Sequence, residues 1–186
     1  MPDPAASSIL QHAQRVLDTE AAALAKLATQ LPPDFQAATE AMLACQGRVI
    51  VSGVGKSGHI GRKIAATFAS TGTPSYFIHA TEASHGDLGM IGPQDLCLLI
   101  SNSGETAELK DMIAHTRRFS IPMAAISSNG ASTLSKAANF KLTLPDAPEA
   151  CPIGLAPTTS TTMALALGDA LAVALIPSLP SCLAVL

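Results

Sequence analysis

Apolar positions at the start of this chain recur with the spacing of a helix. They are Ile9, Val16, Leu17, Leu24 and Leu27. This pattern predicts an amphipathic helix, because such residues share one face of the 3.6-residue turn. Ser7 or Ser8 is expected to cap its start, and Pro32-Pro33 to end it. A second helix is expected to follow, with Asp34 as its cap.

From residue 49 onward, short apolar runs alternate with helical stretches. The expected strands are Val49–Ser52, Tyr76–Ile78, Leu96–Ile100, Met123–Ile126 and Phe140–Leu144. The expected helices begin near Lys56, Glu105 and Ala131, with a shorter turn near His85 and a last helix from Thr158 towards Leu175. Continuous apolar strands between helices predict a parallel sheet that helices cover on both faces. We therefore expect one three-layer α/β domain across the 186 residues.

The composition limits the partners that this surface can have. Charged residues make up 13% of the chain, whereas a typical soluble domain has about 25%. So few charges predict that copies of the chain cover part of the surface. The net charge is −3 and the sequence has no basic block, so no nucleic acid partner is expected.

The lack of a visible targeting signal and the spacing of the cysteines lead us to expect a cytoplasmic protein. The first eight residues lack the pattern of a signal peptide. Pro177 and Pro180 interrupt the apolar C-terminus before it reaches the ~20 residues of a membrane span, so no membrane partner is expected. The four cysteines match no zinc spacing and are expected to be reduced thiols.

The loop after the third expected strand carries a phosphate signal. Its polar side chains are Ser101, Asn102, Ser103 and Thr106. Gly104 allows close approach of the backbone, and a helix that begins at Glu105 would present free N–H groups to an anion. The alternative is simple capping of that helix by Ser103, but one hydroxyl is enough for a cap.

The glycine loop after the first expected strand is ambiguous by itself. Gly53, Gly55 and Gly58 satisfy the G-x-G-x-x-G pattern. A dinucleotide site also needs a carboxylate about 20 positions further on, and the next strand ends at His79 without one. A nucleotide P-loop would need glycine where Ile50 stands. What remains is a turn that presents Lys56 and Ser57 to an anion.

Two further polar segments leave alternatives open. The first contains His79, Glu82, His85 and Asp87, which either hold a metal, contact sugar hydroxyls or simply bond to neighbours in a loop. The second is Glu149, which follows the fifth strand and is either a site carboxylate or a solvated one. The hydroxyl run of residues 158–162 either caps the last helix or contacts substrate oxygens.

These segments together resemble the SIS (sugar isomerase) domain family, and more closely its D-arabinose 5-phosphate isomerases. The matching segments are residues 51–90, ISNSGETAEL, EACPIGLAPTTSTT and GDALAVAL. The resemblance implies a five-stranded parallel sheet between helices and assembly as a homotetramer. It also implies isomerisation of ribulose 5-phosphate and arabinose 5-phosphate through an enediol, for Kdo and lipopolysaccharide synthesis. No metal or other cofactor is expected.

The resemblance also assigns roles to individual residues. Those implied to bind the sugar phosphate are Ser57, Ser101, Asn102, Ser103 and Thr106. Those that match polar active-site positions are Lys56, His85, Glu108 and Glu149. Among these, Glu149 is our candidate for the group that moves the proton between C1 and C2, because a carboxylate can act first as base and then as acid.

The end of the chain departs from the family pattern. Many members carry two CBS domains, which this sequence lacks, and a Ser-His-Pro-Gly-Gly motif after GDALAVAL. Here residues 176–186 read IPSLPSCLAVL. We therefore expect a single domain over residues 1–186, with a core of about 10–175, an atypical tail and weakened turnover. The alternatives are an isomerase for another ketose phosphate and a sugar-phosphate sensor without activity.

Overall fold

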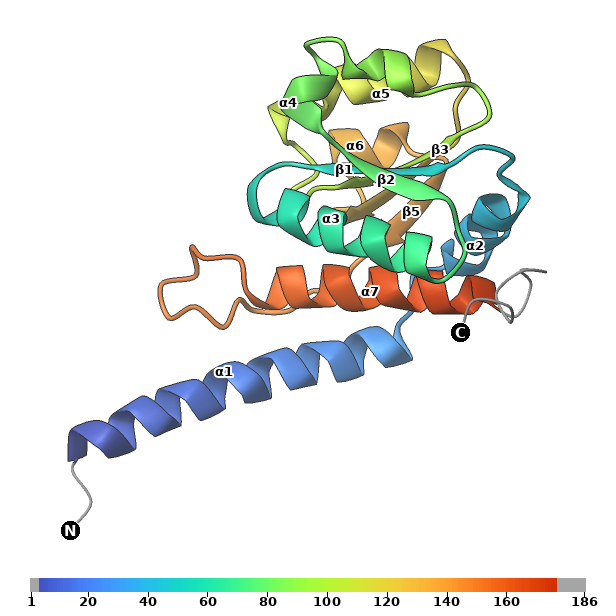
Figure 1. Ribbon diagram of the computed structural model, residues 1–186. Helices are drawn as coiled ribbons and strands as arrows, with labels where there is room; N and C mark the ends of the chain where they lie inside the picture. The colour runs from blue at the N-terminus through green and yellow to red at the C-terminus, as the bar shows by residue number, and fades with distance from the viewer. Residues whose placement is uncertain (1–3, 177–186) are drawn as a thin grey trace.

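Five parallel strands form one sheet in the order β2-β1-β3-β4-β5 (Figure 1). They are β1 (Val49–Gly53), β2 (Ser75–His79), β3 (Leu96–Ile100), β4 (Met123–Ser127) and β5 (Phe140–Thr143). The computed structural model describes residues 4–176. Every expected strand is confirmed. β1 pairs directly with β3, with Gly53 opposite Ile100, so the loops after these two strands lie at one edge.

Helices cover both faces of the sheet, which confirms the predicted three-layer architecture. One face carries α1 (Pro4–Thr29), α2 (Phe35–Ala44), α3 (Gly55–Ser70) and α7 (Thr159–Leu175). The other carries α4 (Ala80–Ala83), α5 (Lys110–Arg118), α6 (Thr133–Ala137) and the 3₁₀ turns η1 (Asp87–Met90) and η2 (Ala107–Leu109). Strand residues alternate between the two cores: Val49 and Val51 face the first, and Ile50 faces the second.

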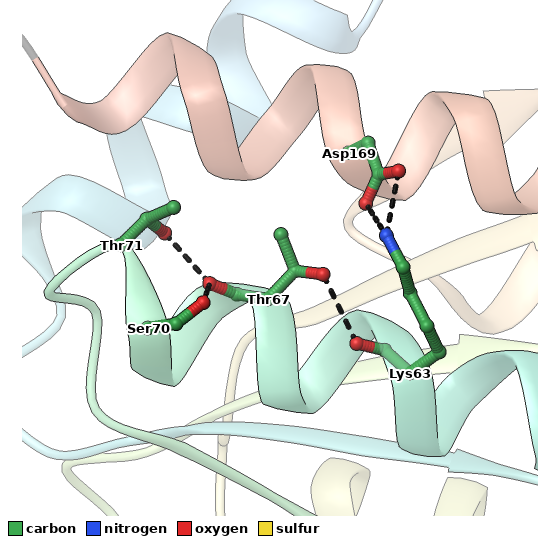
Figure 2. Close-up of polar contacts among 5 residues, drawn as sticks. All are labelled: Lys63, Thr67, Ser70, Thr71 and Asp169. Carbon is green, nitrogen blue, oxygen red and sulfur yellow. Dashed lines mark hydrogen bonds and ion pairs between the residues drawn. The ribbon is translucent and has the colours of Figure 1, made fainter.

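Helices α3 and α7 pack closely against each other. A side chain at Gly168 on α7 would collide with Ile64 on α3, so glycine is what allows the helices to approach. Beside this contact, Lys63 of α3 forms an ion pair with Asp169 of α7 (Figure 2). Both helices begin at the edge where the strands end, so their packing sets the distance between their first turns.

Two expected helix caps are wrong. Helix α1 already begins at Pro4, so Ser7 and Ser8 lie inside it and not at its start. Asp34 does precede α2, but its side chain makes no capping bond to that helix. Its Oδ2 instead accepts a hydrogen bond of 2.8 Å from the backbone N–H of Lys141 in β5. The carboxylate therefore ties α2 to the edge strand.

The helix expected at Glu105 begins later. Gly104 has a φ of +69°, and Thr106 has extended backbone angles, so the chain turns twice before any helical residue. The short turn η2 follows, and α5 starts only at Lys110. The free N–H groups that the sequence assigned to Glu105 are therefore displaced by several residues.

Much of α1 extends beyond the body of the domain (Figure 1). Ile9, Leu10 and Leu17 are exposed on this part of the helix. Among residues 4–176, no helix is both long and apolar enough to cross a membrane. The tail expected to be atypical falls, apart from Ile176, outside the described residues.

Candidate active site

A small cavity of about 40 Å³ lies at the carboxyl edge of the sheet. Its polar lining residues are Ser57, Asn102, Ser160 and Thr161. Its apolar lining includes Ile60, Ile100, Ile126, Leu144 and Ala164. Parallel α/β sheets bind ligands at this edge, because the loops and helix N-termini converge there. Two of the expected substrate residues, Ser57 and Asn102, thus share one cavity with the first turns of α7.

The hydroxyls of the expected phosphate loop are held together by the loop itself. Ser101 Oγ lies 2.7 Å from Thr106 Oγ1, and it also accepts a bond of 3.0 Å from the N–H of Gly104. Within the pair of Ser101 and Thr106, one hydroxyl donates its hydrogen to the other. The hydrogen of the accepting hydroxyl therefore remains free to bond to a ligand. Ser103 Oγ accepts from the N–H of Glu105 at 3.2 Å and does not cap α5.

The end of β4 and the segment between β4 and α6 hold this loop in place. Asn102 is held twice: its backbone oxygen accepts from Ser127 Oγ at 3.1 Å, and its side-chain Oδ1 accepts from Ser128 Oγ. The second bond orients the amide so that its Nδ2 hydrogens can point towards a ligand. Gly104 packs so tightly against Ser132 that any side chain there would collide with it.

Glu105 fastens the same loop to α6. Its Oε1 accepts a hydrogen bond of 2.8 Å from the N–H of Thr133, the first residue of that helix. This bond lowers the pKa of the Glu105 carboxyl, and the nearby charges of Lys136 and Lys110 lower it further. The loop is therefore positioned by contacts to a segment almost 30 residues away.

Glu149 is bound to the start of α7. Its Oε2 accepts hydrogen bonds from the N–H of Thr158 at 2.7 Å, the hydroxyl of Thr158 at 3.0 Å and the N–H of Ser160 at 3.3 Å. The first turn of a helix has unpaired N–H groups, and a carboxylate there is stabilised by them and by the helix dipole. Glu149 is thus half-buried and held in place, which differs from a freely solvated loop carboxylate.

These contacts keep Glu149 ionised. Burial by itself would raise the pKa of the carboxyl, but the bonds from Thr158 and Ser160 outweigh it and the pKa is lowered overall. The Ser160 hydroxyl adds to this stabilisation, although its geometry falls short of a hydrogen bond to any described residue. All three described bonds end on Oε2, which leaves Oε1 as the oxygen that can take a proton.

The other expected active-site residues lie on exposed surface around this edge. Lys56 is in the first turn of α3, Glu108 is in η2, and His85 is in the turn between α4 and η1. None of the three lines the cavity described above. His79 accepts a bond of 3.3 Å from the N–H of Thr81. Within residues 4–176, no group of three or more His, Cys, Asp or Glu side chains could hold a metal ion.

The sequence did not single out several residues that the fold brings to this edge. Ser127, Ser128 and Ser132 were missed, although they follow the fourth strand and so had to lie near the other loops. Ser160 and Thr161 were seen only as part of a hydroxyl run whose role was left open. The contact of Glu105 with Thr133 had no local signal, because it depends on how α6 packs.

The chain is similar in sequence to known arabinose 5-phosphate isomerases. An arabinose 5-phosphate isomerase KdsD of Yersinia pestis is 56% identical over 166 residues, which cover 89% of this chain and 51% of the relative. An arabinose 5-phosphate isomerase KpsF of Escherichia coli O6:H1 is 50% identical over 95% of this chain and 55% of the relative. The chain therefore spans about half the length of the curated relatives that it matches.

The chain also resembles a solved structure and matches a family model. The structure of an E. coli CFT073 protein in complex with A5P superposes with a TM-score of 0.89 and 39% identity, over 92% of each chain. Residues 42–174 match the SIS domain family, and they contain the whole sheet and every residue that lines the cavity. This chain therefore belongs to the SIS domain family.

Proposed function

We propose that this chain binds arabinose 5-phosphate and interconverts it with ribulose 5-phosphate, in the synthesis of Kdo for lipopolysaccharide. The observation that carries the proposal is the position of Glu149. This ionised carboxylate is fastened to the same α7 turn whose Ser160 shares a cavity with Asn102 of the phosphate loop. Relatives of 50–56% identity that are named arabinose 5-phosphate isomerases support the choice of sugar.

The reaction would use the two parts of the site for different tasks. The loop of residues 101–106, with Ser57 beside it, holds the phosphate group. That contact fixes the sugar so that C1 and C2 lie near Glu149, and such positioning converts an intermolecular proton transfer into an intramolecular one. Glu149 Oε1 removes a proton from one carbon and returns it to the other, with an enediol between the two steps.

Three exposed residues would complete the chemistry. A carbonyl oxygen gains negative charge as the enediol forms, so a cation or a hydrogen-bond donor close to it lowers the barrier. Lys56 and His85 are our candidates for that task, and Glu108 for a proton transfer in opening the sugar ring. Neither a metal nor another cofactor is needed for this sequence of steps.

We further propose that the protein is a cytoplasmic homotetramer. Only 13% of the residues are charged. In addition, large apolar side chains are exposed on α1, on the loop before α7 and on α7 itself, and contact between subunits would bury them. Examples are Leu17, Ile153, Leu155 and Val173. Light scattering should then give four times the 18.9 kDa chain mass, whereas a monomer at micromolar concentration would contradict the assembly.

The test of the activity is an exchange experiment in D₂O. Ribulose 5-phosphate is incubated with the chain, and the appearance of arabinose 5-phosphate that carries deuterium at C2 is followed by NMR. An enediol route predicts this label because the base exchanges its proton with solvent. Binding without product or label would favour the sugar-phosphate sensor, and faster conversion of a hexulose phosphate would favour another SIS isomerase.

A further inference from the structure

Ser160 has a buried hydroxyl without a partner. The residue is 7% exposed, and its Oγ makes no hydrogen bond within the described part of the chain. Folded proteins rarely leave a buried hydroxyl unpaired, because it has lost its water and gained nothing in return. Ser52 and Thr73 carry the other two such hydroxyls among the described residues, so each case has to be judged by its surroundings.

The surroundings of Ser160 are those of a binding site. It lines the cavity at the carboxyl edge together with Ser57 and Asn102. By contrast, Ser52 lies inside β1, and Thr73 lines a different cavity, which it shares with Pro74 and Leu175. Of the three unpaired hydroxyls, Ser160 is therefore the one that shares a cavity with residues expected to bind substrate.

The chemistry around Ser160 selects the kind of ligand atom. Its own backbone N–H is bonded to the Glu149 carboxylate, so a negative charge lies next to the cavity. The rest of the lining is mainly apolar, with Ile100, Ile126 and Leu144. Next to Ser160, a phosphate would be repelled by the carboxylate and would lose its hydration against these side chains, whereas a hydroxyl or carbonyl oxygen would not.

The size of the cavity agrees with a single group. About 40 Å³ admits one or two water-sized groups but not a five-carbon sugar. We propose that Ser160 is a substrate-contacting residue whose hydroxyl bonds to one uncharged oxygen of the sugar, beside Glu149, while the phosphate lies in the loop of residues 101–106. The proposal rests on the sugar-phosphate function given above. It adds a contact at the reacting end of the sugar.

The test compares Ser160→Ala with Thr73→Val, which removes the other unpaired hydroxyl that faces a cavity. Unfolding temperature is measured without ligand and with arabinose 5-phosphate, and affinity is measured by calorimetry for the sugar phosphate and for inorganic phosphate. Ser160→Ala should change the ligand-free unfolding temperature little, since the hydroxyl makes no hydrogen bond to a described residue and only adds to the stabilisation of the Glu149 charge. It should weaken arabinose 5-phosphate about tenfold, as expected for one lost hydrogen bond, and leave inorganic phosphate unchanged.

Other results would overturn the inference or the sugar proposed above. If the hydroxyl only holds a structural water, Ser160→Ala lowers the ligand-free unfolding temperature and leaves the affinity unchanged. An equal loss for sugar phosphate and inorganic phosphate would place the contact at the phosphate instead. If the wild type binds a different ketose phosphate, with the same dependence on Ser160, the proposed sugar is wrong and the Ser160 contact stands. A wild type that binds no sugar phosphate would overturn both.

Discussion

Lys63 Nζ lies 2.5 and 2.7 Å from the two carboxylate oxygens of Asp169, and this ion pair joins α3 to α7 (Figure 2). The residues are 106 positions apart in the sequence. Each helix contributes its first turn to the cavity, with Ser57 on α3 and Ser160 on α7. The pair therefore bridges the two helices on which the two sides of the candidate site are built.

The ion pair should contribute little to stability. Both side chains are well exposed, at 48% and 39%, so water screens their attraction. A double-mutant cycle with Lys63→Ala and Asp169→Ala should give a coupling of at most about 1 kcal/mol in urea unfolding. The coupling should decrease as salt is added. A larger coupling that is insensitive to salt would contradict this prediction.

Ser128 should act through Asn102. Ser128→Ala removes the donor that orients the Asn102 amide, so the amide can rotate away from a ligand. We expect KM to rise about threefold to tenfold with kcat nearly unchanged, as for the loss of one hydrogen bond. Ser128→Thr should restore the wild-type KM. Ser70→Ala, at the far end of α3, is the matched control and should change neither constant.

Gly104 should tolerate no side chain. Its φ of +69° favours glycine, and a methyl group would collide with Ser132. Gly104→Ala should destabilise the protein by about 1–3 kcal/mol in urea unfolding and weaken phosphate binding. Gly89→Ala is the control, because no atom lies within 4 Å of the added methyl group. Equal losses of stability in the two variants would show that the backbone conformation and close packing of Gly104 do not require glycine.

Glu149→Gln should separate binding from turnover. The glutamine oxygen can still accept from Thr158 and Ser160, so the start of α7 should be preserved. Its amide is not a base, and turnover should fall by roughly 10²-fold or more. Affinity for arabinose 5-phosphate should stay within a few-fold, because the phosphate contacts lie elsewhere. Undiminished turnover in this variant would remove Glu149 from the mechanism.

The same substitution predicts a dependence of stability on pH. The pKa of Glu149 is lowered from its ordinary value of 4.5 in the folded protein. Its charge therefore stabilises the fold above that value, and this contribution is lost as pH falls through the lowered pKa. In urea unfolding, wild type should exceed Glu149→Gln at neutral pH, and the difference should shrink in acid. A difference that grows on acidification would be contrary to the prediction.

The local pattern of the chain determined much of this protein. Apolar runs bounded by turn residues predicted all five strands, since a buried parallel strand needs no polar face. Residue types in single loops were also informative. Three hydroxyls and a glycine between a strand and a helix indicated a phosphate loop, and Glu149 was singled out by its place after the fifth strand. The five strands are confirmed, and the roles of the loop and of Glu149 stay predictions.

Tertiary structure decided what local patterns could not. The order of strands, with β3 beside β1, depends on how each connection crosses the sheet. Asp34 was expected to cap a helix, but its carboxylate accepts a hydrogen bond from the N–H of Lys141. Glu105 was expected to begin a helix, but its carboxylate accepts a hydrogen bond from the N–H of Thr133. Both changes have the same physical reason. A carboxylate takes the best unpaired N–H within reach, and packing of distant segments, not sequence spacing, determines which one that is.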